Sequence, residues 1–354
     1  MVKVIQAAVL ETLGQPLVIK ELELPAILSG QILVKILFSG MCRSQLMEVR
    51  GGRGDDPWVP HLLGHEGSGT VVATGAGVTK VKPGDEVILG WIKSEGLEAP
   101  GAKYKCGDQI INSGRVTTFS NYSIVSESRV VKKPAGLPFD IAILFGCALP
   151  TGAGMVLNEL KPSISSSVVV LGLGGIGLSA LIALKAINIK MIIAIDISEE
   201  KLKLAKQLGA THTFNATDEG FRQAVLNLTN EGADICVESG GQVSTIELGF
   251  SLIRKGGGKL LFASHPPGRE IIRLSPHELI SGKQIAGSWG GATVPDHDIP
   301  KMHTLFQIAD IPLGILITKR YTLEQINEAL DDLEAGRVFR PLIVMQHPDE
   351  VVES

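Results

Sequence analysis

Four glycines and one aspartate give the clearest chemical signal in this sequence. Gly172, Gly174 and Gly177 have the spacing G-x-G-x-x-G, and Gly175 lies between them. In such a turn the first glycine bends the chain, the second lets the backbone approach a pyrophosphate, and the third lets a helix pack closely on a sheet. Asp196 follows Gly177 by 19 residues, where a carboxylate can accept hydrogen bonds from an adenosine ribose. The spacing therefore predicts a dinucleotide site.

The aspartate also bears on which dinucleotide binds. A carboxylate at position 196 would repel the 2′-phosphate of NADP, and residues 197–200 contain no arginine to accommodate that phosphate. The sequence therefore favours NAD. The alternative is a glycine turn that only joins a strand to a helix in some other α/β protein. The residues of the turn that we expect to bind the cofactor are Gly172, Gly174, Gly175, Ile176 and Gly177.

The secondary-structure elements that must position these residues are predicted by the sequence on either side of the turn. Residues 168–171 form a short apolar, β-branched run, which predicts a strand, and the aliphatic segment after Gly177 has helical spacing. A second apolar run, 191–195, ends at Asp196. The order strand, turn, helix, strand and acid is the context in which a G-x-G-x-x-G match predicts a nucleotide site.

Composition sets limits on fold and partners. The chain has 354 residues, enough for about two domains, and its 44% hydrophobic residues indicate a packed protein. A formal net charge of −4 argues against nucleic acid or an anionic membrane as the main partner. No uninterrupted apolar run is long enough to span a bilayer, and residues 1–14 read as a strand rather than a signal peptide. The four scattered cysteines suit a reducing compartment, so we expect a cytoplasmic protein.

The pattern of short runs changes along the chain. Residues 1 to about 90 alternate apolar runs with Gly, Pro and Asp, which predicts a small barrel or sandwich, and 93–107 is expected to be an exposed loop. After the glycine turn, repeated strand and helix signals predict a doubly wound parallel sheet. The C-terminal part predicts a helix over 323–336 and a strand over 341–345.

Together these features resemble the zinc-dependent alcohol dehydrogenase branch of the medium-chain dehydrogenase/reductase superfamily, over nearly the whole chain. The motifs that carry the resemblance are Gly40-Met41-Cys42-Arg43-Ser44, Gly64-His65-Glu66-Gly67, Lys82-Pro83-Gly84-Asp85, Gly146-Cys147, the glycine turn and residues 336–340. The resemblance implies an α/β protein in which 1–148 and 291–354 form a GroES-like, β-rich catalytic domain. Residues 149–290 would form a Rossmann cofactor domain, with the active site in the cleft between the two.

The resemblance also implies one catalytic zinc per subunit, held by Cys42, His65 and Cys147. Two thiolates and one imidazole suit an open zinc site whose fourth position takes water or substrate, although the spacing alone would not reveal it. Glu66 matches the family's carboxylate behind the metal, which can bind it transiently; the alternative is a buried ion pair, for example with an arginine of the cofactor domain. Only Cys106 lies within 91–120, so no second, structural zinc is expected.

Two positions near the ligands depart from the family pattern. Gln45 stands where many members have an aspartate that orients the ligand imidazole, and Met47 stands where some have a proton-relay histidine. A neutral amide can orient the ring but does less to raise its basicity. Ser44 matches the family's hydroxyl that takes the substrate proton and passes it toward the cofactor ribose; the alternative is a turn serine.

Three basic residues are candidate contacts for the cofactor, two of them through the family resemblance. Arg43 and Arg340 correspond to the arginines that contact the pyrophosphate, for which a guanidinium fork is well suited. Lys201 lies five residues after Asp196, where it either contacts the ribose or is a solvated charge on a helix.

The substrate is the least determined feature. Trp91 lies where the family has a pocket-lining residue, but it could equally be a core tryptophan. Arg50, Arg53, Lys103 and Lys105 supply positive charge, which favours a polyol, a sugar derivative or a phosphorylated alcohol over a simple alcohol. The alternative is an enzyme that accepts many apolar alcohols, with these charges merely solvated.

Three functions remain in competition. The first is a zinc- and NAD-dependent oxidoreductase acting on a small-molecule alcohol or its carbonyl. The second is a zinc-free enoyl or quinone reductase using NAD(P)H, and the third is a non-catalytic dinucleotide-binding sensor. We further expect a homodimer, or a tetramer made from dimers, because family members associate through the sheet edge that corresponds to 284–289.

Overall fold

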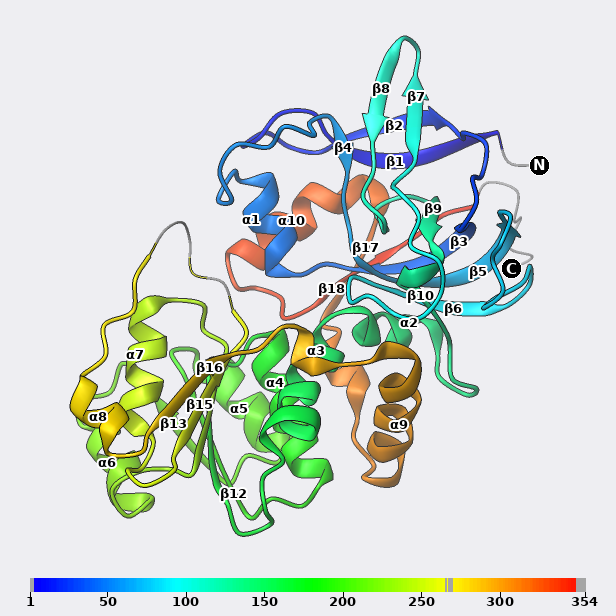
Figure 1. The fold of residues 1–354 in the computed structure, drawn as a ribbon. Helices are drawn as coiled ribbons and strands as arrows, with labels where there is room; N and C mark the ends of the chain where they lie inside the picture. Colours follow the sequence, from blue (N-terminus) through cyan, green and yellow to red (C-terminus); the bar gives the residue numbers. More distant parts are fainter. Residues whose placement is uncertain (1–2, 265, 267–269, 348–354) are drawn as a thin grey trace. The chain divides into compact units, whose positions relative to one another are not determined.

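The computed structural model describes residues 3–264, 266 and 270–347, and the chain forms two compact units (Figure 1). The first unit comprises residues 1–147, 294–299 and 313–354, and the second comprises 148–293 and 300–312. The expected domain boundaries at 148/149 and 290/291 compare with breaks between the units at 147/148 and 293/294. Residues 300–312, however, pack with the second unit.

The first unit is built from two β-sheets. A closed barrel has the order β1-β2-β7-β8-β4, and a second sheet has the order β10-β6-β5-β3-β18-β17, with β9 paired to β3. The barrel strands are β1 (Val4–Leu10), β2 (Val18–Glu23), β7 (Lys103–Cys106), β8 (Gln109–Asn112) and β4 (His61–Leu62). The other strands are β3 (Gln31–Gly40), β5 (Glu66–Thr74), β6 (Glu86–Gly90), β9 (Tyr122–Ser126), β10 (Val130–Lys132), β17 (Lys319–Thr322) and β18 (Pro341–Val344). This sheet structure agrees with the predicted β-rich, GroES-like domain.

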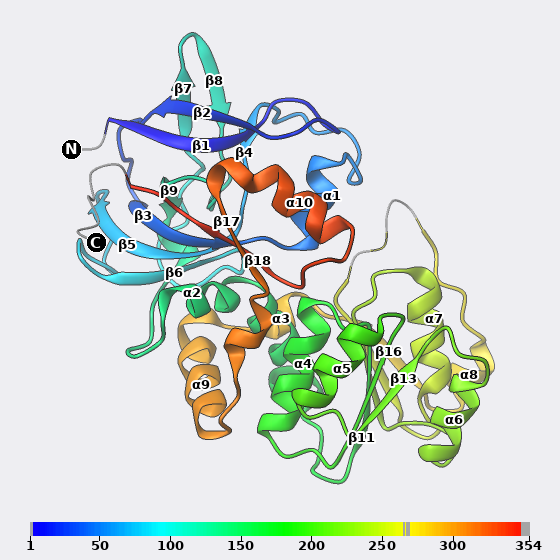
Figure 2. The same ribbon diagram turned by 180° about the vertical axis from the view of Figure 1, so that it is seen from behind.

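Two helices from distant parts of the sequence cover this sheet. Helix α1 (Arg43–Val49) follows β3 directly, and α10 (Ile326–Glu334) lies beside it (Figure 2). Leu46 and Val49 of α1 and Leu330 of α10 are buried in one apolar cluster with strand residues such as Ile36. This packing fixes the start of α1, and with it the residue immediately before the helix, Cys42.

One stretch expected to be a loop contains a strand. Residues 103–106 form β7, which pairs with β8 in an antiparallel hairpin. The alternation Lys-Tyr-Lys places Tyr104 in the interior while Lys103 and Lys105 are exposed, so the segment is a half-buried strand only four residues long. So short an alternation carries little signal among the glycines and lysines around it.

The second unit contains the predicted doubly wound sheet. Six parallel strands have the order β13-β12-β11-β14-β15-β16, so the strand order reverses between β11 and β14. The strands are β11 (Ser167–Leu171), β12 (Met191–Asp196), β13 (His212–Asn215), β14 (Ile235–Glu238), β15 (Lys259–Phe262) and β16 (Gln284–Gly287). The helices are α3 (Ala148–Gly154), α4 (Gly175–Ala186), α5 (Glu199–Gln207), α6 (Phe221–Leu228), α7 (Val243–Leu252) and α8 (Pro276–Ile280). The strand–turn–helix–strand unit predicted around Gly172 is confirmed.

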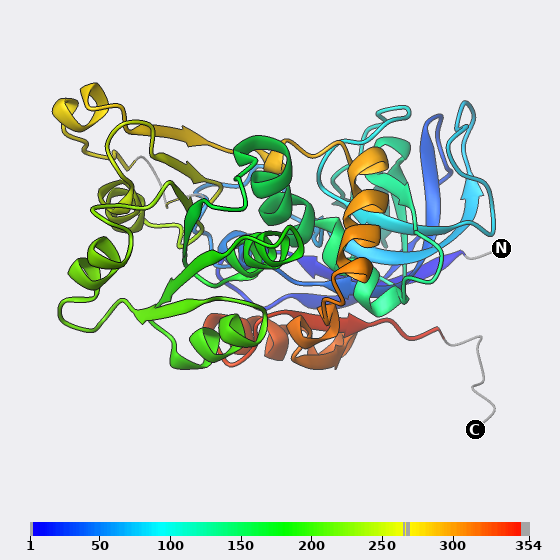
Figure 3. The same ribbon diagram turned by 90° about the horizontal axis from the view of Figure 1, so that it is seen from below.

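Helices cover both faces of this sheet (Figure 3). Val169 and Ile193 pack with Phe250 of α7 in one core cluster. Because side chains alternate along a strand, the neighbouring Val168 and Ile192 face the other side, and they are fully buried as well. Burial on both faces explains why β11 and β12 read as continuous apolar runs.

Further helical segments include α2 (Phe139–Ala142), α9 (Pro295–Ile308), a 3₁₀ turn at Ile143–Gly146 and a π-helical segment at Met155–Leu160. Short 3₁₀ turns lie at Glu127–Arg129, Gly290–Ala292, Leu313–Leu316 and Leu323–Gln325. No single helix in the described part of the chain is long and apolar enough to cross a membrane. One bent pair, Phe139–Gly146 with Ala148–Leu160, meets that test jointly, by length and composition only.

Candidate active site

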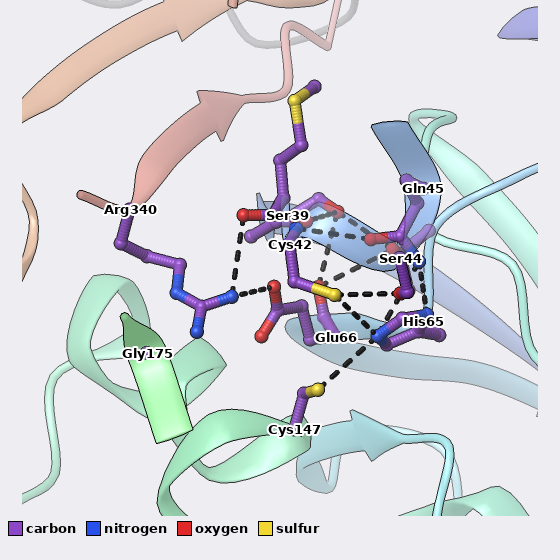
Figure 4. A network of polar contacts seen from close by, with 12 residues as sticks. Ser39, Cys42, Ser44, Gln45, His65, Glu66, Cys147, Gly175 and Arg340 are labelled. Carbon is purple, nitrogen blue, oxygen red and sulfur yellow. Dashed lines mark hydrogen bonds and ion pairs between the residues drawn. The ribbon is translucent and has the colours of Figure 1, made fainter. Parts of the chain in front are cut away.

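The three predicted metal ligands meet in the first unit (Figure 4). His65 Nε2 lies 3.3 Å from Cys42 Sγ and 3.3 Å from Cys147 Sγ, and the three ligand atoms are all within 4.8 Å of one another. All three residues are half-buried. Thus residues far apart in the sequence, with no recognisable ligand spacing, form one cluster.

The geometry of this cluster fits zinc. With a Zn–S bond of about 2.3 Å and a Zn–N bond of about 2.0–2.1 Å, a tetrahedral site separates sulfur from nitrogen by roughly 3.5 Å. The two observed separations of 3.3 Å are close to that value. Three protein ligands of this kind also leave one position open, as catalytic zinc sites require.

The sheet explains why the ligands converge. Cys42 follows β3, His65 precedes β5, and the facing ends of these strands are held together by the pairing of Ser39 with Gly67. Gly146 brings the third ligand in, because a Cβ at this position would lie 2.4 Å from the carbonyl oxygen of Leu89. Only glycine permits this approach of the Cys147 turn to the sheet.

The ligand thiols do not titrate like isolated cysteines. The Cys147 thiol, hydrogen-bonded to Cys42, and the neighbouring His65 imidazole hold the pKa of Cys42 well below its usual range. Thiolate is the form that binds metal, and a divalent cation would release the remaining proton of the pair.

Gln45 connects two of the ligands. Its side chain is buried, its Oε1 accepts a hydrogen bond from the Cys42 backbone N–H at 3.1 Å, and its Nε2 contacts His65 Nδ1. Because Nδ1 is engaged, Nε2 of the imidazole faces the two sulfurs. The amide holds the imidazole ring in place without bringing a negative charge beside it. When Nε2 binds a metal the ring proton lies on Nδ1, which then donates to an acceptor, as the amide oxygen can provide.

Replacing Gln45 with leucine is expected to weaken zinc binding by roughly 10- to 100-fold, the usual cost of losing a group that orients a ligand. Competition with a chromogenic chelator measures this affinity directly. Gln45→Asp, which places a carboxylate acceptor beside Nδ1, is the comparison variant and should bind zinc at least as tightly as the wild type. A leucine variant with wild-type zinc affinity would show that the ring is held by other contacts.

Glu66 lies behind the cluster in a buried ion pair. Its Oε1 accepts a hydrogen bond from Arg340 Nη1 at 2.7 Å, and both side chains are almost completely buried. The alternative of a buried ion pair, suggested with an arginine of the cofactor domain as the example, is therefore observed, but its partner Arg340 directly precedes β18 in the first unit. Burial raises the pKa of Glu66 even with this arginine beside it. Among the described residues Glu66 Oε2 has no hydrogen-bond partner, which fits a role facing a cation.

The other family-derived residues are placed as follows. Ser44 Oγ lies 2.8 Å from Cys42 Sγ, so its hydroxyl borders the ligand cluster, as the proton-relay prediction requires. Arg43 is exposed at the start of α1, whereas Arg340 is buried against Glu66. Their contacts with a pyrophosphate remain predictions.

Trp91 lies next to the Cys147 turn. Its backbone N–H donates to the carbonyl of Gly146 at 3.4 Å, and Arg129 Nη1 donates to its carbonyl at 2.6 Å. The tryptophan is half-buried rather than a core residue. Its backbone is therefore hydrogen-bonded to the residue that precedes the ligand Cys147, and a place for its side chain at the substrate position remains a prediction.

The charges that favoured a polar substrate are largely engaged elsewhere. Arg50 binds Asp331 at 2.6 Å and Glu334 at 2.9 Å, both on α10, and Arg53 lies 3.4 Å from Glu48. Lys103 and Lys105 belong to the β7–β8 hairpin, which extends from the end of the first unit opposite α2 (Figures 1 and 2). The expectation that these four residues recognise an anionic or polyhydroxylated substrate is therefore not supported.

A second group of side chains of the types that bind metals lies at residues 48–61, around Arg50 and Arg53. Glu48, Asp56 and His61 bring their ligand atoms within 4.8 Å of one another. His61 Nε2 is already 2.8 Å from Asp56 Oδ2, and Arg53 supplies a positive charge to Glu48. Local ion pairs account for this group without a metal.

The glycine turn of the second unit fits a dinucleotide. Gly172 has φ +85°, a conformation that side chains disfavour, and a Cβ at Gly177 would lie 1.9 Å from the Gly172 carbonyl oxygen. A Cβ at Gly174, by contrast, would have no atom within 4 Å. Gly174 caps α4, which has no side-chain cap, so the open space lies at a helix N-terminus with its unpaired N–H groups. Phosphate groups bind at such positions.

Asp196 lies beside this turn, as predicted. Its Oδ2 accepts a hydrogen bond from the Leu173 N–H at 2.6 Å, and its Oδ1 accepts one from the Ser198 N–H at 3.0 Å. The carboxylate therefore anchors the glycine turn and still has lone pairs for a ribose. Lys201 is the third residue of α5, which begins at Glu199, and its ribose contact remains a prediction.

Sequence reasoning missed one buried acid in the second unit. Glu238 ends β14, has no exposed surface, and accepts hydrogen bonds from the backbone N–H of Gly240 and the hydroxyl of Thr245. The signal was present in residues 235–241, ICVESGG, where an apolar run ends in an acid before two glycines, much as 191–196 ends in Asp196.

A Cys-His-Cys cluster on a GroES-like unit and a glycine turn on a Rossmann unit define a zinc- and dinucleotide-dependent dehydrogenase. The chain belongs to the zinc-dependent alcohol dehydrogenase branch of the medium-chain dehydrogenase/reductase superfamily. Residues 28–135 match the alcohol dehydrogenase GroES-like domain, and residues 175–307 match the zinc-binding dehydrogenase domain.

Individual relatives agree with this assignment. The chain is 31% identical to an alcohol dehydrogenase class-3 of Cereibacter sphaeroides, covering 96% of this chain and 99% of the relative. It is 32% identical to an NDMA-dependent alcohol dehydrogenase of Amycolatopsis methanolica, covering 96% of this chain and 98% of that relative. The crystal structure of benzyl alcohol dehydrogenase from Acinetobacter calcoaceticus has a TM-score of 0.88 at 29% identity, covering 98% of this chain and 100% of that one. The protein is a zinc-dependent oxidoreductase that uses NAD and acts on an alcohol or its carbonyl.

Proposed function

We propose that the substrate is an uncharged primary or secondary alcohol whose apolar part packs against Trp91. The observation that carries this proposal is the hydrogen bond of 3.4 Å from the Trp91 backbone N–H to the carbonyl of Gly146, the residue that precedes the ligand Cys147. An indole provides a large apolar surface and no charge, so it favours an apolar or aromatic substituent. The benzyl alcohol dehydrogenase noted above is a structural relative whose name indicates such a substrate.

Each residue of the site then has a defined role. Cys42, His65 and Cys147 hold zinc, which when bound polarises the substrate oxygen and makes its proton easier to remove. Ser44 Oγ, which borders the ligand cluster, accepts that proton as its own hydroxyl proton passes on toward the cofactor ribose. Gln45 keeps the imidazole oriented, and Glu66 balances Arg340 behind the site.

The second unit supplies the cofactor site. NAD accepts the hydride when it is bound, and the protein determines how it is held. The open space at Gly174 receives the pyrophosphate, and Asp196 receives the adenosine ribose. Met47 can neither accept nor donate a proton, so the proton that Ser44 passes on leaves without a histidine relay at that position.

A substrate screen tests the proposal. NAD reduction should show a higher kcat/KM with benzyl-type and medium-chain alcohols than with polyols or sugar phosphates, and Trp91→Ala should lower kcat/KM most for the aromatic alcohols. A higher kcat/KM with polyols or phosphorylated alcohols would contradict the proposal and restore the polar substrate that the sequence favoured. Wild-type protein with well under one zinc per chain would instead support the zinc-free reductase or the sensor.

We also propose a homodimer, or a tetramer made from dimers, formed along β16. This strand is the last in the six-stranded sheet, its residues are largely exposed, and Trp289 just beyond it has 71% of its surface exposed. An uncovered edge of this kind is a site for strand pairing with another copy. Sedimentation equilibrium at micromolar protein should give at least twice the chain mass of 37.6 kDa, and a mass near 37.6 kDa would contradict the proposal.

We propose the cytoplasm as the location. The four cysteines, all within the described residues, form no disulfide, and two of them are assigned to zinc as thiolates. A reducing compartment keeps such thiols available for metal.

A further inference from the structure

Glu238 is a buried carboxylate that the reaction described above does not use. None of its surface is exposed, and its partners at Oε1 are all neutral: the N–H of Gly240 at 2.6 Å, the N–H of Gly241 at 3.2 Å and the hydroxyl of Thr245 at 2.7 Å. Its Oε2 has no hydrogen-bond partner among the described residues. Burial raises the pKa of Glu238 from its usual value, and the neutral donors only oppose that shift.

Such a group is costly to keep for stability alone. A buried charge without a counter-charge destabilises the folded state, and natural proteins retain such groups mainly where they function. In the described part of the chain, Glu238 forms no ion pair with a lysine or arginine, whereas Glu66, which also has no exposed surface, pairs with Arg340. The missing positive charge points to a ligand.

The position of Glu238 indicates which ligand. Glu238 ends β14 and is in register with Leu171, the last residue before Gly172, so it lies where the strand order reverses. Ligands of open α/β sheets bind at the carboxyl edge of this reversal. The turn after Glu238 also touches the glycine turn, because Ser239 Oγ donates to the Gly172 carbonyl at 2.6 Å.

Two acids therefore flank β11 at the same edge of the sheet, Asp196 at the end of β12 and Glu238 at the end of β14. In a sheet of this kind each half binds one mononucleotide of a dinucleotide. With the adenosine half at Asp196, the nicotinamide half lies on the side of Glu238. The oxidised nicotinamide ring carries a positive charge, and the reduced ring does not.

We propose that Glu238 supplies the negative charge that complements the oxidised nicotinamide ring, so that this residue makes the protein bind NAD⁺ more tightly relative to NADH. This inference rests on the proposed NAD site. Direct contact is not required, because charges buried in the protein are screened far less than charges at the surface. Glu238 is a specificity-determining residue in this role and takes no part in proton or hydride transfer.

The test compares the dissociation constants of NAD⁺ and NADH for the zinc-loaded wild type and Glu238→Gln, measured by titration calorimetry and NADH fluorescence. The glutamine keeps an acceptor for the Gly240 and Thr245 donors but removes the charge. We expect the NAD⁺ constant to rise on the order of tenfold, a typical coupling between groups, while the NADH constant changes much less. Glu219→Gln, at an exposed carboxylate of the same unit, is the matched control and should change neither.

Other outcomes would overturn the inference. An equal loss of affinity for both cofactor forms would mean that Glu238 only holds its turn, and no change in either would remove the role altogether. If Glu238→Gln does not fold, Glu238→Asp serves instead. That variant keeps the charge and should keep the wild-type ratio of the NADH dissociation constant to the NAD⁺ dissociation constant. A fall in that ratio would contradict the charge argument. Failure of the wild type to bind NAD would instead refute the proposed cofactor site.

Discussion

Replacing Cys147 with serine is expected to remove the catalytic zinc and to lower kcat/KM for alcohol oxidation by on the order of 10³-fold or more. The cluster has only three protein ligands, so losing one thiolate leaves two, too few for a stable zinc site. Bound metal contributes several kcal/mol to the transition state, and each 1.36 kcal/mol or so corresponds to a tenfold change in rate. Metal analysis after extensive dialysis, together with steady-state kinetics, measures both effects.

Cys106→Ser is the matched control for this substitution. Cys106 lies at the end of β7 in the hairpin and outside the ligand cluster, so its variant should keep about one zinc per chain and the wild-type rate. A Cys147→Ser protein that retains both zinc and activity would show that the cluster is not the catalytic centre. Loss of zinc from the Cys106 variant as well would indicate a second metal site that uses this cysteine.

The glycine turn and the acid at the end of the next strand could be predicted because their signals are local. Gly172, Gly174, Gly177 and Asp196 lie within one strand–turn–helix–strand unit. The glycines follow from backbone requirements that few other residue types meet, and the aspartate from the hydrogen bonds that a ribose can donate. The structure adds that Asp196 also anchors Leu173, a contact that no spacing rule contains.

The metal cluster was predicted through a family resemblance, not through spacing. Cys42, His65 and Cys147 come from three separate segments, and their approach depends on strand pairing and on the glycine at position 146. Ion-pair partners that lie far apart in the sequence could not be predicted for the same reason. Arg50 binds carboxylates on α10 that follow it by more than 280 residues, so its charge seemed available for substrate when only the sequence was considered.

Asp196 is expected to determine the choice of cofactor, and wild-type protein should prefer NAD to NADP by on the order of 100-fold in kcat/KM. Like charges brought together at a binding site cost several kcal/mol, and the aspartate would face the 2′-phosphate of NADP with no arginine to offset it. Asp196→Asn combined with Ile197→Arg should move the preference toward NADP. Ile197 has 71% of its surface exposed, so an arginine fits there without repacking the core.

The asparagine in this double variant matters because Asp196 has two functions. Its Oδ2 holds the glycine turn through the Leu173 N–H at 2.6 Å, and an amide oxygen can take over that bond while removing the charge. Asp196→Gly with Ile197→Arg lacks the acceptor, so it should show a similar change in preference but weaker binding of both cofactors. Comparing the kcat/KM values for NAD and NADP of the two double variants therefore separates electrostatic selection from positioning of the turn. Wild-type protein that reduces NADP as efficiently as NAD would show that the carboxylate does not select the cofactor.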